Sequence, residues 1–221
     1  MDITLAITIG IPLLIVAYIV KSDKFPEPSG LIVKTFLMGV FLCFPAGWLN
    51  GYLIWNQENP DNYSFLAGLT EESLKFLALY FYIKPKGAFN EPMDAIVYGI
   101  TISLGFAAWE NLEYVYLYNE DISSLSVAII RAISAIPLHA SCGIIMGYFF
   151  GLYIFKGAKV YIYQALIIPI CIHAFYNFLA GLGNLIFFPY LFLVIFFALR
   201  MHKELITLQK NKKFEAERKV N

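Results

Sequence analysis

The sequence predicts an all-α protein: a polytopic transmembrane bundle of about seven helices, with the N-terminus outside and the C-terminus in the cytoplasm. Of its 221 residues, 59% are hydrophobic and 14% are charged, against about 25% charged in an ordinary soluble domain. The mean hydropathy is +0.66. The 16 basic and 16 acidic residues leave no net charge, so the composition indicates no nucleic-acid partner. We therefore expect the lipid bilayer as the surrounding medium and exclude a soluble globular protein.

Seven apolar runs approach the roughly 20 residues that a helix needs to cross a bilayer. The predicted spans are Ile3 to Val20, Leu31 to Trp55, Phe65 to Ile83, Asp94 to Tyr118, Ser126 to Phe155, Val160 to Leu182 and Leu185 to Leu199. The fifth run is too long to cross upright, so it must tilt, kink at Pro137 or protrude. Asp94 is expected to cap the start of the fourth helix.

Basic residues lie in alternate connections, which predicts the orientation. The first, third and fifth connections carry Lys21 and Lys24, Lys84 and Lys86, and Lys156 and Lys159, whereas the others are acidic or uncharged, with Glu58, Asp61, Glu120 and Asp121. Cytoplasmic loops retain Lys and Arg, so the N-terminus is predicted outside. The chain from Arg200 onwards is strongly basic. We therefore expect one transmembrane domain over residues 1–200 and a basic cytoplasmic tail over residues 201–221.

Ionisable residues inside the predicted spans are the main functional signal. Each costs about 2.5–3.5 kcal/mol at mid-bilayer, so such residues normally face the bundle interior and mark a site. They are Glu71, Glu72, Lys75, Glu110, Glu113, Arg131, His139 and His173. A helical rise of about 1.5 Å per residue puts the glutamates and histidines roughly 10–20 Å below the outer surface. Side chains from four helices are thus predicted to meet in one outer-leaflet layer.

Local spacing refines this prediction. Lys75 follows Glu71 by four residues, which favours an ion pair between them and leaves Glu72 to point elsewhere. Gly143, Gly147 and Gly151 follow His139 at four-residue intervals, a ridge that allows close helix packing and turns the histidine into the bundle. Arg131 is expected either to pair with an acid or to extend to the membrane surface.

Glutamate and histidine together can activate water, because one group removes a proton while another stabilises the developing oxyanion. The same residue types hold zinc, and Glu110, His139 and His173 would leave a fourth position open. There is no HExxH stretch, so a zinc site would need ligands from separate helices. Both a metal-free hydrolase and a zinc hydrolase fit these residues. Buried Glu and His chains also occur in ion-coupled or proton-relay transporters, which is the alternative function.

Four ordered motifs resemble the PrsW family of bacterial intramembrane proteases, within the wider group of CAAX-processing and bacteriocin-processing membrane proteases. They are Glu-Glu-Ser-Leu-Lys at 71–75, Phe-Ala-Ala-Trp-Glu-Asn at 106–111, Pro-Leu-His-Ala at 137–140 and His-Ala-Phe-Tyr-Asn at 173–177. The resemblance extends to Asp-Lys-Phe-Pro-Glu-Pro at 23–28 and Met-Asp-Ala-Ile-Val-Tyr-Gly at 93–99. It therefore covers the first six predicted helices.

The resemblance implies a multi-pass protease of the bacterial cell membrane that cuts another membrane protein. The typical substrate is an anti-sigma factor, cut on its extracytoplasmic side as the first step (site-1 cleavage) of a signalling cascade. Carried over by position, the catalytic residues would be Glu71, Glu72, Glu110, His139 and His173, with Asn177 as an oxyanion or orienting donor. In the wider group a histidine stands where this chain has Glu110, so a metal, with zinc as the candidate, stays open beside a metal-free mechanism.

Overall fold

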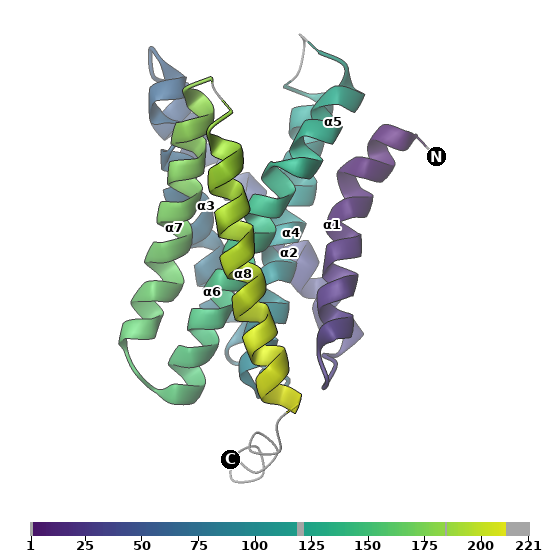
Figure 1. The fold of residues 1–221 in the computed structure, drawn as a ribbon. Helices are drawn as coiled ribbons and strands as arrows, with labels where there is room; N and C mark the ends of the chain where they lie inside the picture. Colours follow the sequence, from purple (N-terminus) through teal and green to yellow (C-terminus); the bar gives the residue numbers. More distant parts are fainter. Residues whose placement is uncertain (1, 119–121, 184, 211–221) are drawn as a thin grey trace.

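The computed structural model describes residues 2–118, 122–183 and 185–210, and these are helical with no strand among them (Figure 1). The all-α prediction is therefore confirmed. The helices are α1 Ile3–Ser22, α2 Ser29–Asn50, α3 Leu66–Ala78, α4 Pro92–Tyr116, α5 Ser124–Ile133, α6 Ala135–Lys156, α7 Val160–Gly181 and α8 Phe187–Lys210. Two π-helical turns, η1 Gly51–Trp55 and η3 Leu79–Ile83, extend α2 and α3, and a short 3₁₀ turn, η2 Pro60–Tyr63, precedes α3.

All seven predicted runs are helical. Five helices in the described part of the chain are long and apolar enough to cross a membrane: Ile3–Ser22, Ser29–Trp55, Pro92–Tyr116, Ser124–Lys156 and Val160–Gly181. Helices α3 and α8 occupy the third and seventh predicted runs, but α3 carries three charged side chains and the second half of α8 is charged. The chain is thus a multi-pass membrane bundle.

Helix α4 is the central helix of the bundle. Within its most apolar window, 89% of the residues are buried, against 28% in α1, α2 and α7. It packs against α1, α2 and α6, which surround it in Figure 1. Side chains on α4 are therefore held on several sides, whereas the outer helices present apolar residues to the surroundings.

The predicted glycine ridge on α6 packs directly against α4. A Cβ atom on Gly147 would lie 2.2 Å from the Ala95 carbonyl oxygen, and one on Gly143 would lie 2.8 Å from the Gly99 carbonyl oxygen. The two backbones approach so closely that neither position has room for a side chain. This contact fixes the rotation of α6 and points His139 into the bundle, as the spacing predicted.

The long fifth run bends at Ser134, which separates α5 from α6. Pro137 causes the break because its ring clashes with the carbonyl group four residues earlier, at Ile133, where α5 ends. The Ser134 hydroxyl donates a hydrogen bond to the Ile130 carbonyl oxygen at 2.7 Å. The predicted kink is confirmed, three residues ahead of the proline that produces it.

The structure moves the predicted start of the fourth helix by two residues. Asp94 caps α4 as expected, but from its third position, because the helix begins at Pro92 with Glu91 as N-cap.

Helix α8 continues to Lys210 and buries Gln209, so the first half of the expected tail is helical. Residues 211–221 of that tail, and Glu120 and Asp121 of the fourth connection, lie outside the described residues. The orientation in the membrane stays a prediction.

We expect Gly147→Ala to destabilise the bundle by about 1–3 kcal/mol, because the added methyl group overlaps the α4 backbone. Gly10→Ala is the matched control, since a Cβ there meets no atom within 4 Å. That change should be neutral or stabilising by up to about 1 kcal/mol. Thermal unfolding of the two purified variants in detergent gives the comparison. Equal melting temperatures would contradict the close α4–α6 packing.

Candidate functional site

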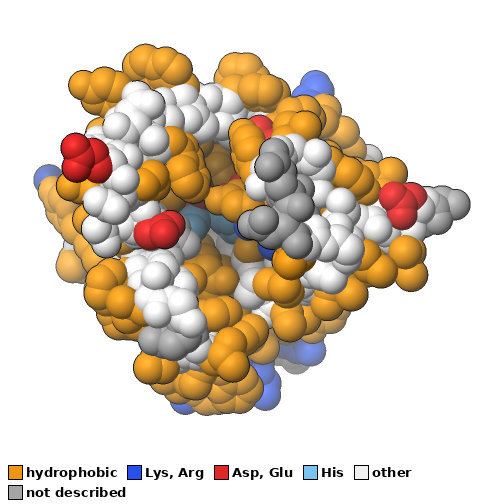
Figure 2. Space-filling model, turned by 90° about the horizontal axis from the view of Figure 1, so that it is seen from above, with side chains coloured by type: hydrophobic (Ala, Val, Ile, Leu, Met, Phe, Trp, Pro, Cys, Tyr) orange, Lys and Arg blue, Asp and Glu red, His pale blue; other side chains and the backbone are white. Residues whose placement is uncertain are grey.

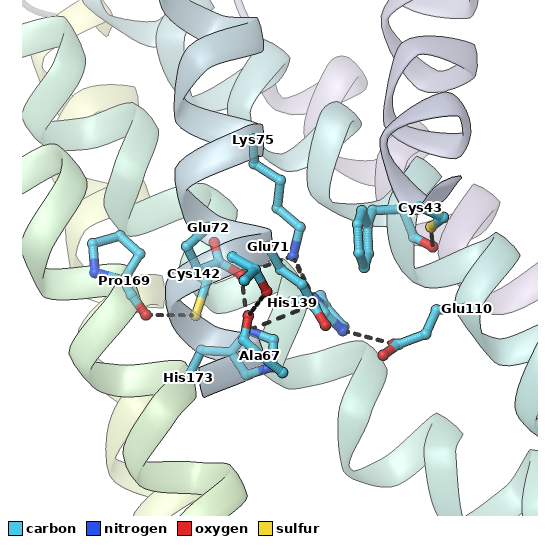
Figure 3. Close-up of polar contacts among 12 residues, drawn as sticks. Cys43, Ala67, Glu71, Glu72, Lys75, Glu110, His139, Cys142, Pro169 and His173 are labelled. Carbon is cyan, nitrogen blue, oxygen red and sulfur yellow. Dashed lines mark hydrogen bonds and ion pairs between the residues drawn. The ribbon is translucent and has the colours of Figure 1, made fainter. Parts of the chain in front are cut away.

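Four buried side chains from three helices form one group inside the bundle (Figure 3). Glu71 and Glu72 come from α3, His139 from α6 and His173 from α7, and each is at most 3% exposed. Each offers a possible ligand atom, and these four atoms lie within 4.8 Å of one another. The predicted convergence of glutamates and histidines is therefore found in the structure.

Close backbone packing brings α3 and α7 together at this group. A Cβ atom on Gly68 would lie 2.4 Å from the backbone nitrogen of Ala174, so only glycine fits there. Gly68 is one turn before Glu72, and Ala174 is next to His173. The glycine thus lets the glutamates of α3 reach the histidine of α7.

Lys75 lies at the centre of the polar group. Its Nζ atom is 2.7 Å from Glu72 Oε1, 2.9 Å from His139 Nδ1 and 3.7 Å from Glu71 Oε2. The predicted pairing of Lys75 with Glu71 is confirmed, but the expectation that Glu72 points elsewhere is wrong, because Glu72 makes the shorter contact. Lys75 is three residues from one acid and four from the other, and both spacings lie on the same side of a helix. Both acids therefore face the same buried ammonium group.

The contacts of His139 fix its tautomer. A lysine ammonium group only donates hydrogen bonds, so His139 Nδ1 accepts the one from Lys75. In the neutral ring Nε2 then carries the proton, and it donates to Glu110 Oε2 at 3.0 Å. Glu110 thus contacts the far side of the His139 ring and lies outside the group of four.

Arg131 holds Glu110 in place. Its Nη2 atom is 2.5 Å from Glu110 Oε2, and its Nε atom donates to the Asn111 side-chain oxygen. Of the two expectations for Arg131, acid pairing is confirmed. The result is a chain of contacts from the arginine through the carboxylate to the imidazole.

The two glutamates differ in how firmly they are held. Glu72 Oε1 contacts both Lys75 and His173 Nδ1, the latter at 2.9 Å. Glu71 Oε1 accepts a hydrogen bond from Asn50 Nδ2 at 3.4 Å, while its buried Oε2 has no hydrogen-bond partner in the described chain. Each glutamate keeps one buried oxygen without a hydrogen-bond donor in the described chain, but Glu72 has two close contacts and Glu71 only one long one, so Glu71 is the more loosely held.

Two asparagines differ from the sequence prediction: Asn177 lies away from the group, and Asn50 contacts it. Asn177 donates its side-chain amide to the Ser64 carbonyl oxygen at 3.2 Å, which ties α7 to the segment before α3. It is one turn beyond His173 and does not contact the four residues. Asn50 is a site residue that sequence reasoning missed, although a lone asparagine in an apolar run was the available signal.

The group is reached from one end of the bundle. Seen from above, the molecule is hollowed at its middle, and a histidine side chain is visible at the floor of the hollow (Figure 2). The side chains of Glu110 and Arg131 are 17% and 14% exposed, whereas those of the four grouped residues are at most 4% exposed. Solvent therefore approaches the site along the side of Glu110.

The donor set fits a metal cation. Two imidazoles and a carboxylate are a usual protein ligand set for catalytic zinc. Glu71 Oε2 and Glu72 Oε2 are buried without hydrogen-bond donors in the described chain, and buried carboxylate oxygens need a compensating charge. The Lys75 ammonium group already lies between Glu72 and His139, so this position attracts positive charge.

Comparison with known proteins agrees with this reading. The family model described as PrsW family intramembrane metalloprotease matches residues 27–200. Protease PrsW of Bacillus subtilis (strain 168) is 33% identical over 214 residues, covering 91% of this chain and 94% of that protein. Protease PrsW of Clostridioides difficile (strain 630) is 34% identical over 182 residues, covering 76% of each. No solved structure matches. The resemblance predicted from the motifs is confirmed.

Lys75→Met should destabilise the metal-free protein by about 3–5 kcal/mol, because it leaves Glu72 buried without its charge partner. Lys159→Met, at an exposed position, is the control and should change stability by less than about 0.5 kcal/mol. Unfolding in detergent with a chelator present measures both. A Lys75 variant as stable as the control would contradict a charged ion pair between Lys75 and Glu72.

Proposed function

The chain belongs to the PrsW family of intramembrane metalloproteases, and from this premise we propose how its residues hydrolyse a peptide bond and which substrate they cut. It is a protease of a bacterial membrane whose substrate is a membrane protein. Because the family is proteolytic, the transporter alternative is set aside. The observation that carries the proposed mechanism is the group of Glu71, Glu72, His139 and His173, in which Glu71 is the more loosely held carboxylate.

Glu72, His139 and His173 are the proposed metal ligands, with zinc as the metal. Glu110 orients the His139 ring, and Glu72 and His173 already contact each other at 2.9 Å, so the three donor groups lie side by side. Lys75 must withdraw from between Glu72 and His139 for these atoms to bind a cation. A zinc ion at this position would supply Lewis acidity that polarises the substrate carbonyl group.

Glu71 is the proposed general base. Its Oε2 atom has no hydrogen-bond partner in the described chain and lies 3.7 Å from Lys75 Nζ and 3.9 Å from His173 Nδ1, so it is beside the ligands and less tightly held than Glu72. In this position Oε2 takes a proton from the attacking water and returns it to the leaving amine nitrogen. The Asn50 amide, bonded to Oε1, keeps the carboxylate in place during both transfers.

Glu110 and Asn177 are proposed as positioning residues. Glu110 accepts the His139 Nε2 proton and so presents Nδ1 to the centre of the group, which is the usual carboxylate–histidine–metal arrangement. Asn177 donates a hydrogen bond from α7 to the Ser64 carbonyl oxygen and so fixes the position of His173 along the helix axis. We assign it the orienting role, because its amide is engaged away from the four residues.

The proposed substrate is an anti-sigma-factor-like membrane protein, cut near the extracytoplasmic surface as the first step of a cascade. The family resemblance suggests this class. The predicted orientation supports it, because Glu71, Glu72 and Glu110 lie toward the helix ends opposite the basic connections. A substrate segment entering the hollow of Figure 2 from that side would reach the histidine at its floor without crossing the bundle.

The two glutamates should separate in their effects. Glu71→Gln should lower turnover by about 10²–10⁴-fold and keep zinc, because it removes a proton acceptor. Glu72→Gln should lose both zinc and activity, because it removes a ligand. The assay is cleavage of a single-span membrane protein co-reconstituted in vesicles, with zinc measured on the same samples.

Glu113→Gln is the matched control, since Glu113 accepts a hydrogen bond from Trp109 on α4 and lies outside the group. It should keep zinc and activity. If Glu71→Gln turned over substrate at the wild-type rate, the assignment of the base would be wrong. If Glu72→Gln kept its zinc, the ligand assignment would be wrong.

Chelator treatment should abolish cleavage, and stoichiometric zinc should restore it, because the ligand set favours zinc and the site is buried. The same treatment should lower the melting temperature, since a bound cation stabilises the folded state. Full activity in metal-depleted protein would instead support the metal-free glutamate and histidine mechanism.

A further inference from the structure

A second group of buried acids lies at the other end of α4. Carboxylate oxygens of Asp23, Glu91 and Asp94 lie within 4.8 Å of one another. These residues are 6%, 2% and 0% exposed. Asp23 follows α1, and the other two begin α4. The group joins the sequence motifs at 23–28 and 93–99, which the proteolytic site does not use.

This group is separate from the proteolytic site. Asp94 and Glu110 are both on α4, sixteen residues apart, which is about 24 Å along a helix axis. The second group holds carboxylates and no imidazole, whereas the proteolytic site holds two histidines. The two groups therefore differ in position and in donor chemistry.

Neighbouring side chains and backbone groups hold the acids in place. Gln209, from α8, donates its side-chain amide to Asp23 Oδ1 at 2.8 Å and to Glu91 Oε1 at 2.5 Å. Asp94 Oδ2 accepts the backbone N–H groups of Asn90 and Glu91 at 2.7 and 2.8 Å. Each aspartate thus has one oxygen fixed by a donor.

The other aspartate oxygens have no such donor. Asp23 Oδ2 and Asp94 Oδ1 are buried and receive no hydrogen bond from the described residues. Neither aspartate forms a salt bridge within the described part of the chain. Buried carboxylates without a partner are costly, so these two oxygens indicate a missing positive charge.

We propose that Asp23, Glu91 and Asp94 bind a hard divalent cation, Mg²⁺ or Ca²⁺. Oxygen-only donor sets favour these ions, while zinc prefers nitrogen and sulfur. The ligands come from the α1–α2 connection and the start of α4, and Gln209 of α8 contacts two of them. A cation here clamps α1, α4 and α8 together at the end of the bundle opposite the proteolytic site.

The test uses the purified full-length protein in detergent, stripped with chelator and titrated with Mg²⁺ or Ca²⁺ by calorimetry, with the melting temperature recorded at each concentration. We expect wild type to bind about one cation per chain and its melting temperature to rise. The double variant Asp23→Asn, Asp94→Asn should lose both effects. Asparagine keeps the shape and the acceptor oxygen of each cap, so the helix ends are retained.

Glu204→Gln is the matched control, because it removes one exposed acid from α8 near the same end; it should bind the cation as wild type does. If the double variant does not fold, Asp23→Asn alone should bind with at least about tenfold lower affinity. Wild type that binds neither cation, or a double variant that binds as wild type does, overturns the proposal. Zinc content and proteolysis, measured on the same samples, report separately on the other site.

Discussion

In the metal-free protein, a lysine ammonium group buried between a carboxylate and an imidazole is the contact on which the arrangement of the site depends. Removing a charge from water costs several kcal/mol unless partners surround it, and Lys75 is 0% exposed. Its contacts to Glu72 and His139 join α3 to α6, and Glu72 joins both to α7 through His173. The relative positions of three helices are therefore fixed by one set of charges.

Glycines make that set of charges possible. Gly68 allows α3 to touch α7, and Gly147 allows α6 to touch α4. The helices are therefore close enough for their polar side chains to contact one another directly. Helix α4 is buried on almost every side and presents Glu110 to His139 from a rigid support. Tight packing around the group leaves the side of Glu110, whose side chain is 17% exposed, as the approach.

The sequence was sufficient for the helices and for the meeting of the glutamates and histidines, because hydropathy sets the spans and a constant helical rise sets the level of each residue along its helix. Rotation about each helix axis was harder to predict. It decides that Glu72 rather than Glu110 joins the group of four, and that Asn177 faces Ser64. The second acidic group could not be seen at all, since it needs packing between distant segments and a helical Gln209 where a tail was expected.

The most direct test of the central claim is the zinc K-edge X-ray absorption spectrum of the active, zinc-loaded protein. Ligation by Glu72, His139 and His173 predicts scattering from two imidazoles and only nitrogen or oxygen neighbours, at about 2.0–2.2 Å. A sulfur neighbour at about 2.3 Å, or a ligand shell without imidazole, would contradict the account.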